Sequence, residues 1–148
     1  MKTIFDKATR DELIARIKTL NENSKPQWGK MNIYQMLKHY VLWDEWISGK
    51  KTYKRQFLGR LFGKMALKSV LKDDRPMMRN AITYPEFKIK EKNGDVEAEK
   101  AKWITQTEGH AHFSNPGFVH TFFGKMTKAQ IGYLAYKHAD HHLRQFNS

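Results

Sequence analysis

Near its C-terminal end the chain reads Tyr136-Lys137-His138-Ala139-Asp140-His141-His142-Leu143-Arg144-Gln145. His138 and His142 are four residues apart, so on a helix both imidazoles lie on one face, one turn from each other. Apolar residues share that face: Ile131, Leu134, Ala135 and Phe146. Both histidines are therefore expected at the core. An unpaired buried polar group costs about 1–3 kcal/mol, so these side chains need a partner.

The composition is that of a folded globular protein. The chain has 148 residues, of which 40% are hydrophobic, which is enough for one domain with its own core. We expect a single helical domain over residues 1–148. The sequence contains no cysteine, which excludes disulfides and thiolate metal ligands.

The sequence gives less specific information about cellular location and binding partners. Residues 1–6 lack the apolar core of a signal peptide, and no run approaches the roughly 18 apolar residues of a membrane-spanning helix. We therefore expect a soluble, cytoplasmic protein. The 27 basic and 15 acidic residues give a net charge of +12. Such a charge permits binding to nucleic acid, anionic membranes or anionic small molecules, and selects none of them.

Capping boxes, in which Ser, Thr, Asp or Asn precedes Glu or Gln by three residues, mark several helix starts. The boxes are Thr9 with Glu12, Asn32 with Gln35, and Thr127 with Gln130. Helical apolar spacing predicts helices over 9–20, 32–48, 55–71, 95–107 and 127–146, and no alternating pattern predicts a strand. We predict an all-α fold: a four-helix bundle with an extra helical segment between the second and the penultimate helix.

A third histidine completes a candidate metal site. His39 is the only other histidine inside a strongly amphipathic helix, on the flank of that helix's apolar stripe. Two helices that pack face to face would bring His39 toward His138 and His142. Three neutral imidazoles suit zinc, nickel, iron or copper and do not distinguish them. Three protein ligands leave open positions for water or substrate, as in catalytic zinc sites.

Two stretches of the sequence resemble a known family. The run His138-Ala139-Asp140-His141-His142-Leu143-Arg144-Gln145-Phe146 resembles the His-x-x-His-His signature on the last helix of the DinB-like superfamily. The run Met31-Asn32-Ile33-Tyr34-Gln35-Met36-Leu37-Lys38-His39 resembles the second helix of that superfamily, which supplies its first metal histidine. Residues 120–127 resemble a subgroup described as a domain of unknown function, although that subgroup usually has proline where this chain has Thr121. The resemblance extends over residues 28–146 and is loose over 50–102.

The resemblance implies a four-helix bundle of DinB-like type, often dimeric, with a divalent metal ion (Zn, Ni or Fe) on His39, His138 and His142. Some relatives are transferases or isomerases that use low-molecular-weight thiols, and many have no known activity. We therefore expect a metal-dependent transferase or hydrolase acting on a small molecule, as a homodimer without a membrane partner. Whether the protein is an enzyme stays open. The alternative is a non-catalytic metal-binding or oligomeric helper protein.

The remaining histidines receive different expectations. His120 and His141 are the candidates for a catalytic proton donor or base. For His120 a role as a fourth ligand or proton donor competes with a role in stabilising its loop, and we favour the loop. His141 lies at the edge of the apolar stripe, away from its centre. We expect His110 and His112 on a loop surface.

Other polar and aromatic residues near the site are predicted to be structural. Asp140 and Arg144 have the i, i+4 spacing of a solvated salt bridge on the outer face of the helix. Gln145 either forms a hydrogen bond near the site or makes a plain helix-end contact. Trp43 and Trp46 are expected in the core.

A basic segment supports a competing hypothesis. Residues 50–72 contain eight basic side chains and no acidic one, with Phe57 and Phe62 among them. Such a segment can neutralise phosphates, so a nucleic-acid-binding protein is the second alternative. No recognised base-reading motif accompanies the lysines, and we expect this segment not to be the functional centre.

Overall fold

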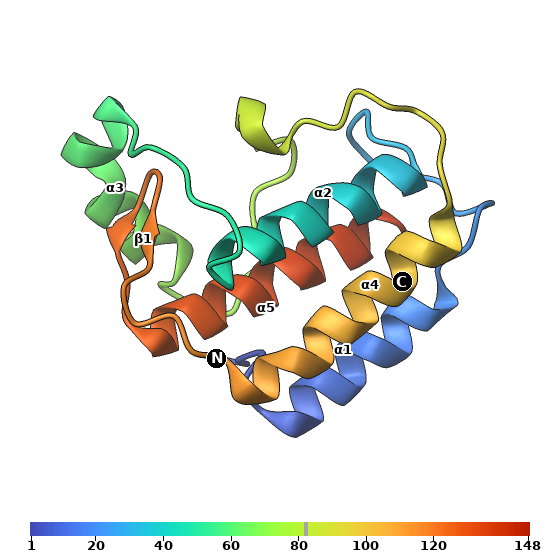
Figure 1. Ribbon diagram of the computed structural model, residues 1–148, viewed down its shortest axis with the longest axis horizontal. Coiled ribbons are helices and arrows are strands. Elements are labelled where there is room, and N and C mark those ends of the chain that lie inside the picture. The colour runs from blue at the N-terminus through green and yellow to red at the C-terminus, as the bar shows by residue number, and fades with distance from the viewer. Residues whose placement is uncertain (82) are drawn as a thin grey trace.

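The computed structural model describes residues 1–81 and 83–148 and is mostly helical (Figure 1). The elements in chain order are α1 (Lys7–Thr19), α2 (Ile33–Ile47), α3 (Phe57–Val70), η1 (Pro85–Phe87), α4 (Val96–Gly109), η2 (His110–His112), β1 (Val119–His120), β2 (Gly124–Lys125) and α5 (Lys128–Gln145). Helices α1, α2, α4 and α5 pack on one another, whereas α3 contacts β2 at one end of the molecule. The all-α prediction is confirmed, and the DinB-like type of bundle stays a prediction.

Two of the predicted capping boxes are present. The Asn32 side chain accepts a hydrogen bond from the Gln35 N–H at 2.9 Å, and the Gln35 side chain accepts one from the Asn32 N–H at 3.1 Å. Thr127 and Gln130 form the same reciprocal pair at the start of α5. The Thr9 box is wrong. α1 begins two residues earlier, because the carbonyl of Asp6 already accepts the Arg10 N–H.

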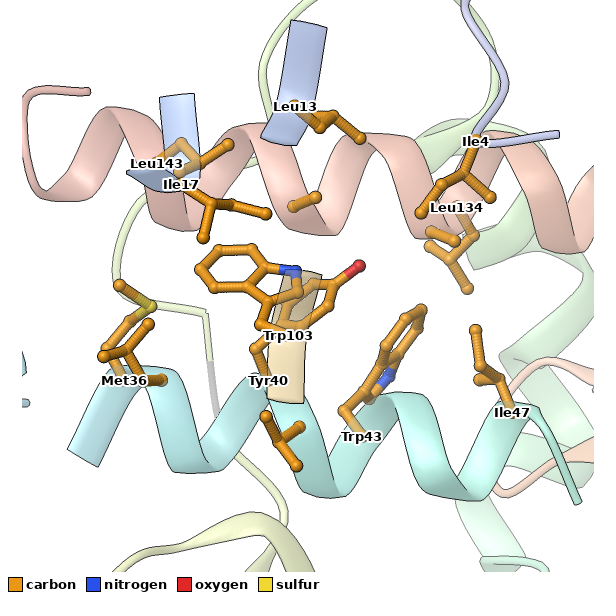
Figure 2. Packing of buried hydrophobic residues seen from close by; sticks show 14 of the residues in the cluster. Ile4, Leu13, Ile17, Met36, Tyr40, Trp43, Ile47, Trp103, Leu134 and Leu143 are labelled. Carbon is orange, nitrogen blue, oxygen red and sulfur yellow. The ribbon is translucent and has the colours of Figure 1, made fainter. Parts of the chain in front are cut away.

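The core lies between the four packed helices (Figure 2). At its centre Trp103 of α4 stacks on Tyr40 of α2, with ring centroids 4.3 Å apart, and both side chains are fully buried. The buried face of α4 is centred on Trp103, and Ala98 and Ala101 on the other side are exposed. Trp43 and Trp46 belong to the core, as predicted.

A short hairpin precedes α5. Val119 pairs with Lys125, and His120 pairs with Gly124, in an antiparallel arrangement. Gly124 has a φ of +81°, which a residue with a side chain rarely adopts. The prediction that no strand forms is therefore wrong here. Strands of two residues are too short to show alternation in the sequence.

Most large apolar residues of α3 do not join the core, which receives only Leu67 of this helix as a buried side chain among the described residues. Phe57, Leu61 and Met65 are each more than 60% exposed. The opposite face of α3, with Gly59 and Gly63, is the buried one. Among the described residues, no helix has the length and apolar content needed to cross a bilayer.

Candidate metal centre

The three histidines singled out from the sequence meet between α2 and α5. His138 and His142 lie on adjacent turns of α5, with their Nε2 atoms 2.9 Å apart. His39 comes from α2, and its Nε2 lies 3.4 Å from that of His138. One ligand atom from each of the three side chains lies within 4.8 Å of the others. The structure therefore brings together residues 99 positions apart at one point.

A backbone carbonyl fixes the protonation of His39. Its Nδ1 lies 2.9 Å from the carbonyl oxygen of Phe87 in η1. A carbonyl can only accept, so the His39 Nδ1 carries the proton and donates it. The Nε2 of His39 then presents a lone pair toward the other two histidines. This is the arrangement that a metal-binding histidine requires.

A glutamine fixes His142 in the same way. The His142 Nδ1 lies 2.9 Å from the Gln145 Oε1. The Gln145 amide cannot be turned round, because its Nε2 donates to the Trp28 carbonyl at 2.9 Å. Gln145 therefore accepts the proton of His142 Nδ1 and leaves a lone pair on Nε2. Of the two roles considered for Gln145, the one near the site is the one observed.

The three side chains fit a cation. The Nε2 atoms of His39 and His142 both carry lone pairs. Neutral His138 has a single ring proton, so it can donate a hydrogen bond to only one of them, and the other lone pair needs a different partner. Imidazole nitrogens on one tetrahedral zinc ion lie about 3.3 Å apart. The separation is 3.4 Å between His39 and His138 and a shorter 2.9 Å between His138 and His142. His138 differs from its neighbours, since its buried Nδ1 has no hydrogen-bond partner among the described residues.

Burial keeps these imidazoles neutral. Loss of solvent lowers the pKa of His39 and places the pKa of His138 and His142 well below the ordinary value of histidine. The neighbouring histidines lower the pKa of His138 further. Tyr40 stacks on His138 and the Trp43 edge meets it, with centroids 5.3 and 4.3 Å away. Neutral imidazole is the form that binds a metal.

The two catalytic candidates lie outside this cluster. His141 is half-buried against the ring of Trp28, at a centroid distance of 5.7 Å. His120 is buried in β1, and its Nδ1 accepts the backbone N–H groups of Phe122 and Phe123, both at 3.1 Å. Burial lowers the pKa of His120 to about 3. His120 therefore stabilises the hairpin turn, the role that the sequence favoured.

His110 corrects the prediction for the loop histidines. It is buried, and its Nε2 lies 2.6 Å from the Oδ1 of Asp44 in α2, whereas His112 is exposed as expected. η2 continues directly from α4 and places His110 against α2. One feature of the sequence indicates a buried polar contact on α2. Asp44 shares the apolar face of α2 with Leu37 and Ile47, and a carboxylate in that position needs a partner.

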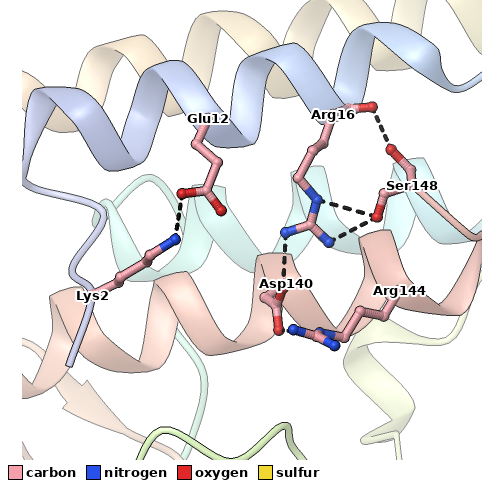
Figure 3. A network of polar contacts seen from close by, with 6 residues as sticks. All are labelled: Lys2, Glu12, Arg16, Asp140, Arg144 and Ser148. Carbon is pink, nitrogen blue, oxygen red and sulfur yellow. Dashed lines mark hydrogen bonds and ion pairs between the residues drawn. The ribbon is translucent and has the colours of Figure 1, made fainter.

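Asp140 also differs from its prediction (Figure 3). Its carboxylate is buried and accepts hydrogen bonds from Arg16 of α1 at 2.8 Å and from Arg144 at 2.7 Å. Arg16 also donates to the carbonyl of Ser148. The predicted pair with Arg144 exists, but it is part of a contact between the first and last helices. Asp140 is buried because α1 packs over this side of α5, whereas the Arg144 side chain stays 55% exposed.

Comparison with known proteins places the chain in a family. A family model described as "Protein of unknown function (DUF1569)" matches residues 5–148. The chain belongs to this family. The matched range includes all three histidines of the cluster. No curated protein and no solved structure matches the chain. The resemblance to the DinB-like superfamily stays a prediction.

Proposed function

We propose that this DUF1569 protein binds one divalent metal ion through His39, His138 and His142 and uses it to activate a small nucleophile, in the manner of the DinB-like superfamily. The observation that carries the proposal is the convergence of the three Nε2 atoms, with two tautomers fixed by Phe87 and Gln145. Zinc, nickel and iron suit three imidazoles. When bound, such an ion lowers the pKa of a coordinated water or thiol.

The residues around the cluster hold the three histidine rings in fixed orientations. Phe87 and Gln145 fix the rings of His39 and His142, and Tyr40 and Trp43 pack against His138. Three protein ligands leave a coordination position of the ion open for an outside ligand. Among the described residues, no carboxylate belongs to the histidine group. We therefore favour a thiol as the nucleophile, because a thiol ionises readily without a protein base. The reaction would then be transfer of the thiol to a small electrophile, and not a hydrolysis that needs a protein base.

Metal analysis tests the binding. Protein without a histidine tag is reconstituted with Zn²⁺, Ni²⁺ or Fe²⁺, and bound metal is measured by mass spectrometry. We expect one ion per chain for the best metal, and loss of stoichiometric binding in His138→Ala and in His142→Ala. His141→Ala is the matched control, one position away on the same helix. Equal loss in His141→Ala and His142→Ala contradicts the ligand assignment.

A non-catalytic metal-binding protein is the second candidate, because His39 and His142 are only 5% and 4% exposed and no carboxylate of the described residues joins them. Cobalt substitution separates the two candidates. In the Co²⁺ protein, a low-molecular-weight thiol that reaches the ion adds a sulfur-to-cobalt absorption band. We expect this band to appear. An unchanged spectrum with thiols and with small anions favours the non-catalytic candidate.

A further inference from the structure

Helix α3 presents an apolar face to solvent. Five large side chains on it are at least half exposed: Phe57 (73%), Leu58 (59%), Leu61 (63%), Phe62 (50%) and Met65 (68%). At 100° per residue they occupy one arc of about 140°. Contiguous exposed apolar patches of this kind are uncommon on soluble monomers and mark interaction sites.

The apolar face of α3 points to solvent because the opposite face of the helix packs on the hairpin. Gly59 and Gly63 lie so close to the backbone of Phe122 that an added Cβ at either position would collide with it. The Gln56 N–H donates to the Thr121 carbonyl at 2.9 Å, just before α3 begins. Figure 1 shows α3 beside the hairpin, at the end of the molecule away from α1 and α4.

The C-terminal end of α3 is also fixed. Lys137 of α5 is buried, and its ammonium group donates to the carbonyls of Val70 and Asp73 at 2.8 and 2.7 Å. Cations at this end of a helix also interact favourably with the helix dipole. The helix is thus anchored at both ends and along its glycine face, and its large apolar side chains stay exposed among the described residues.

Basic side chains flank the apolar face. At 100° per residue, Arg60 and Lys64 lie beside one edge of this arc, and Lys68 lies just inside the same edge. All three are exposed, and none of them has an ion-pair partner among the described residues. No acidic residue occurs anywhere in residues 50–72. Large apolar side chains bordered by Lys and Arg are typical of helices that lie in the surface of anionic membranes.

We propose that α3 is a docking surface for an anionic lipid bilayer, with its apolar face in the headgroup region and its basic edge on the lipid phosphates. This departs from the expectation that the protein has no membrane partner, and it does not depend on the metal centre. The helix lies on the bilayer and does not span it.

Charge complementarity favours the bilayer over other occupants. A second copy of the chain would bring the same basic edge, with no carboxylate in residues 50–72 to meet it. Nucleic acid would pair with the basic edge but would leave Leu58, Leu61 and Met65 without a suitable contact, since these side chains neither stack on bases nor bind phosphate.

Vesicle binding tests the proposal with the full chain. Sedimentation is measured with vesicles of phosphatidylcholine, and with vesicles containing equal parts of phosphatidylcholine and phosphatidylglycerol. The apolar variant combines Phe57→Gln, Leu61→Gln and Met65→Gln. The basic variant combines Arg60→Gln, Lys64→Gln and Lys68→Gln. The control, Lys18→Gln with Lys25→Gln and Lys30→Gln, removes the same charge from exposed positions outside α3.

We expect the wild type to bind the anionic vesicles and not the neutral ones. The apolar variant should lose at least about tenfold in partitioning. The basic variant should lose roughly 100-fold, at about fivefold per charge, and the control less than about fivefold. Circular dichroism and metal content should match the wild type in all three variants, because the changed side chains are exposed and outside the histidine cluster.

Several outcomes overturn the proposal. One is absence of binding to anionic vesicles by the wild type. A second is retention of binding by the apolar variant, which would show a purely electrostatic surface of the kind that also binds nucleic acid. A third is a dimer in light scattering that the apolar variant converts to monomers, which would make a second copy the occupant.

Discussion

Gln145 is the residue on which the orientation of His142 depends. It accepts a hydrogen bond from the imidazole and donates one to the Trp28 carbonyl, so its amide has one possible orientation. We expect Gln145→Met, which keeps the size of the side chain and removes both hydrogen bonds, to weaken metal binding 10- to 100-fold. Competition with a coloured chelator measures this affinity.

A matched variant shows which hydrogen bond matters. Gln145→Glu keeps an oxygen that can accept from His142 and loses the donor to Trp28. It should retain more affinity than Gln145→Met. An affinity of Gln145→Met equal to that of the wild type would mean that His142 does not need this support.

His120 makes stability depend on pH. Burial lowers its pKa to about 3, whereas the unfolded chain takes up the proton near pH 6.5. Between these values the unfolded state binds more protons, so stability falls as the pH drops. The loss attributable to His120 should be about 1.6 kcal/mol between pH 6.5 and pH 5, because the slope approaches 1.36 kcal/mol per pH unit only below pH 6.5.

Urea unfolding of metal-free protein at several pH values measures this dependence. His120→Asn places an oxygen where Nδ1 accepts the N–H groups of Phe122 and Phe123, and it does not titrate. The variant is expected to be less stable at pH 7, because stacking on Phe123 is lost, but to show a flatter pH profile. A variant profile parallel to that of the wild type would show that His120 is not the titrating group.

At the residue scale, the sequence predicted which histidines meet better than it predicted their hydrogen-bond partners. Helical spacing placed His138 and His142 on one face, and the apolar stripe of α2 added His39. The Phe87 carbonyl could not be predicted, since every residue has a carbonyl and only the path of a loop aims one at His39. His110 was missed for a similar reason, because its partner Asp44 lies 66 positions away.

At the scale of elements, α3 depends on two small residues that pack on the hairpin. A Cβ at position 63 would meet the Phe122 carbonyl, so Gly63→Ala should destabilise the protein. Overpacking typically costs about 1–3 kcal/mol, and the better helix propensity of alanine returns up to about 1 kcal/mol. We expect a net loss of about 1 kcal/mol or more in the free energy of unfolding, measured with denaturant.

Gly109 of α4 is the control for this substitution. It has helical backbone angles, and among the described residues no atom lies within 4 Å of the position of its Cβ. Gly109→Ala should therefore be neutral or stabilise by up to about 1 kcal/mol. A Gly63→Ala variant as stable as Gly109→Ala would mean that α3 moves away from the hairpin at little cost.

The elements also show where sequence patterns fail. The boxes at Asn32 and Thr127 were predictable because capping depends on residues three apart in sequence. The exposed face of α3 was not, because periodicity identifies an apolar face without saying whether another element covers it. In α3 the face that packs is the one with Gly59 and Gly63. A hydropathy pattern does not identify this face, because glycine has no apolar side chain.

At the scale of the whole molecule, the histidine cluster joins α2 to α5 across 99 positions of sequence, and Arg16 ties α1 to the same last helix. A ligand that binds only the folded chain stabilises all of it by mass action. At a free metal concentration 100 times the dissociation constant, this amounts to about 2.7 kcal/mol. For a chain of this size it raises the melting temperature by roughly 5–10 °C.

Removal of the metal with a chelator tests whether metal binding stabilises the fold. We expect a chelator to lower the melting temperature of the metal-loaded wild type by that amount, and to leave His138→Ala unchanged, because that variant no longer holds the ion. His141→Ala should respond as the wild type does, since its side chain lies against Trp28 outside the cluster. If His138→Ala responds to the chelator as strongly as the wild type, the stabilising ion is bound outside the histidine cluster.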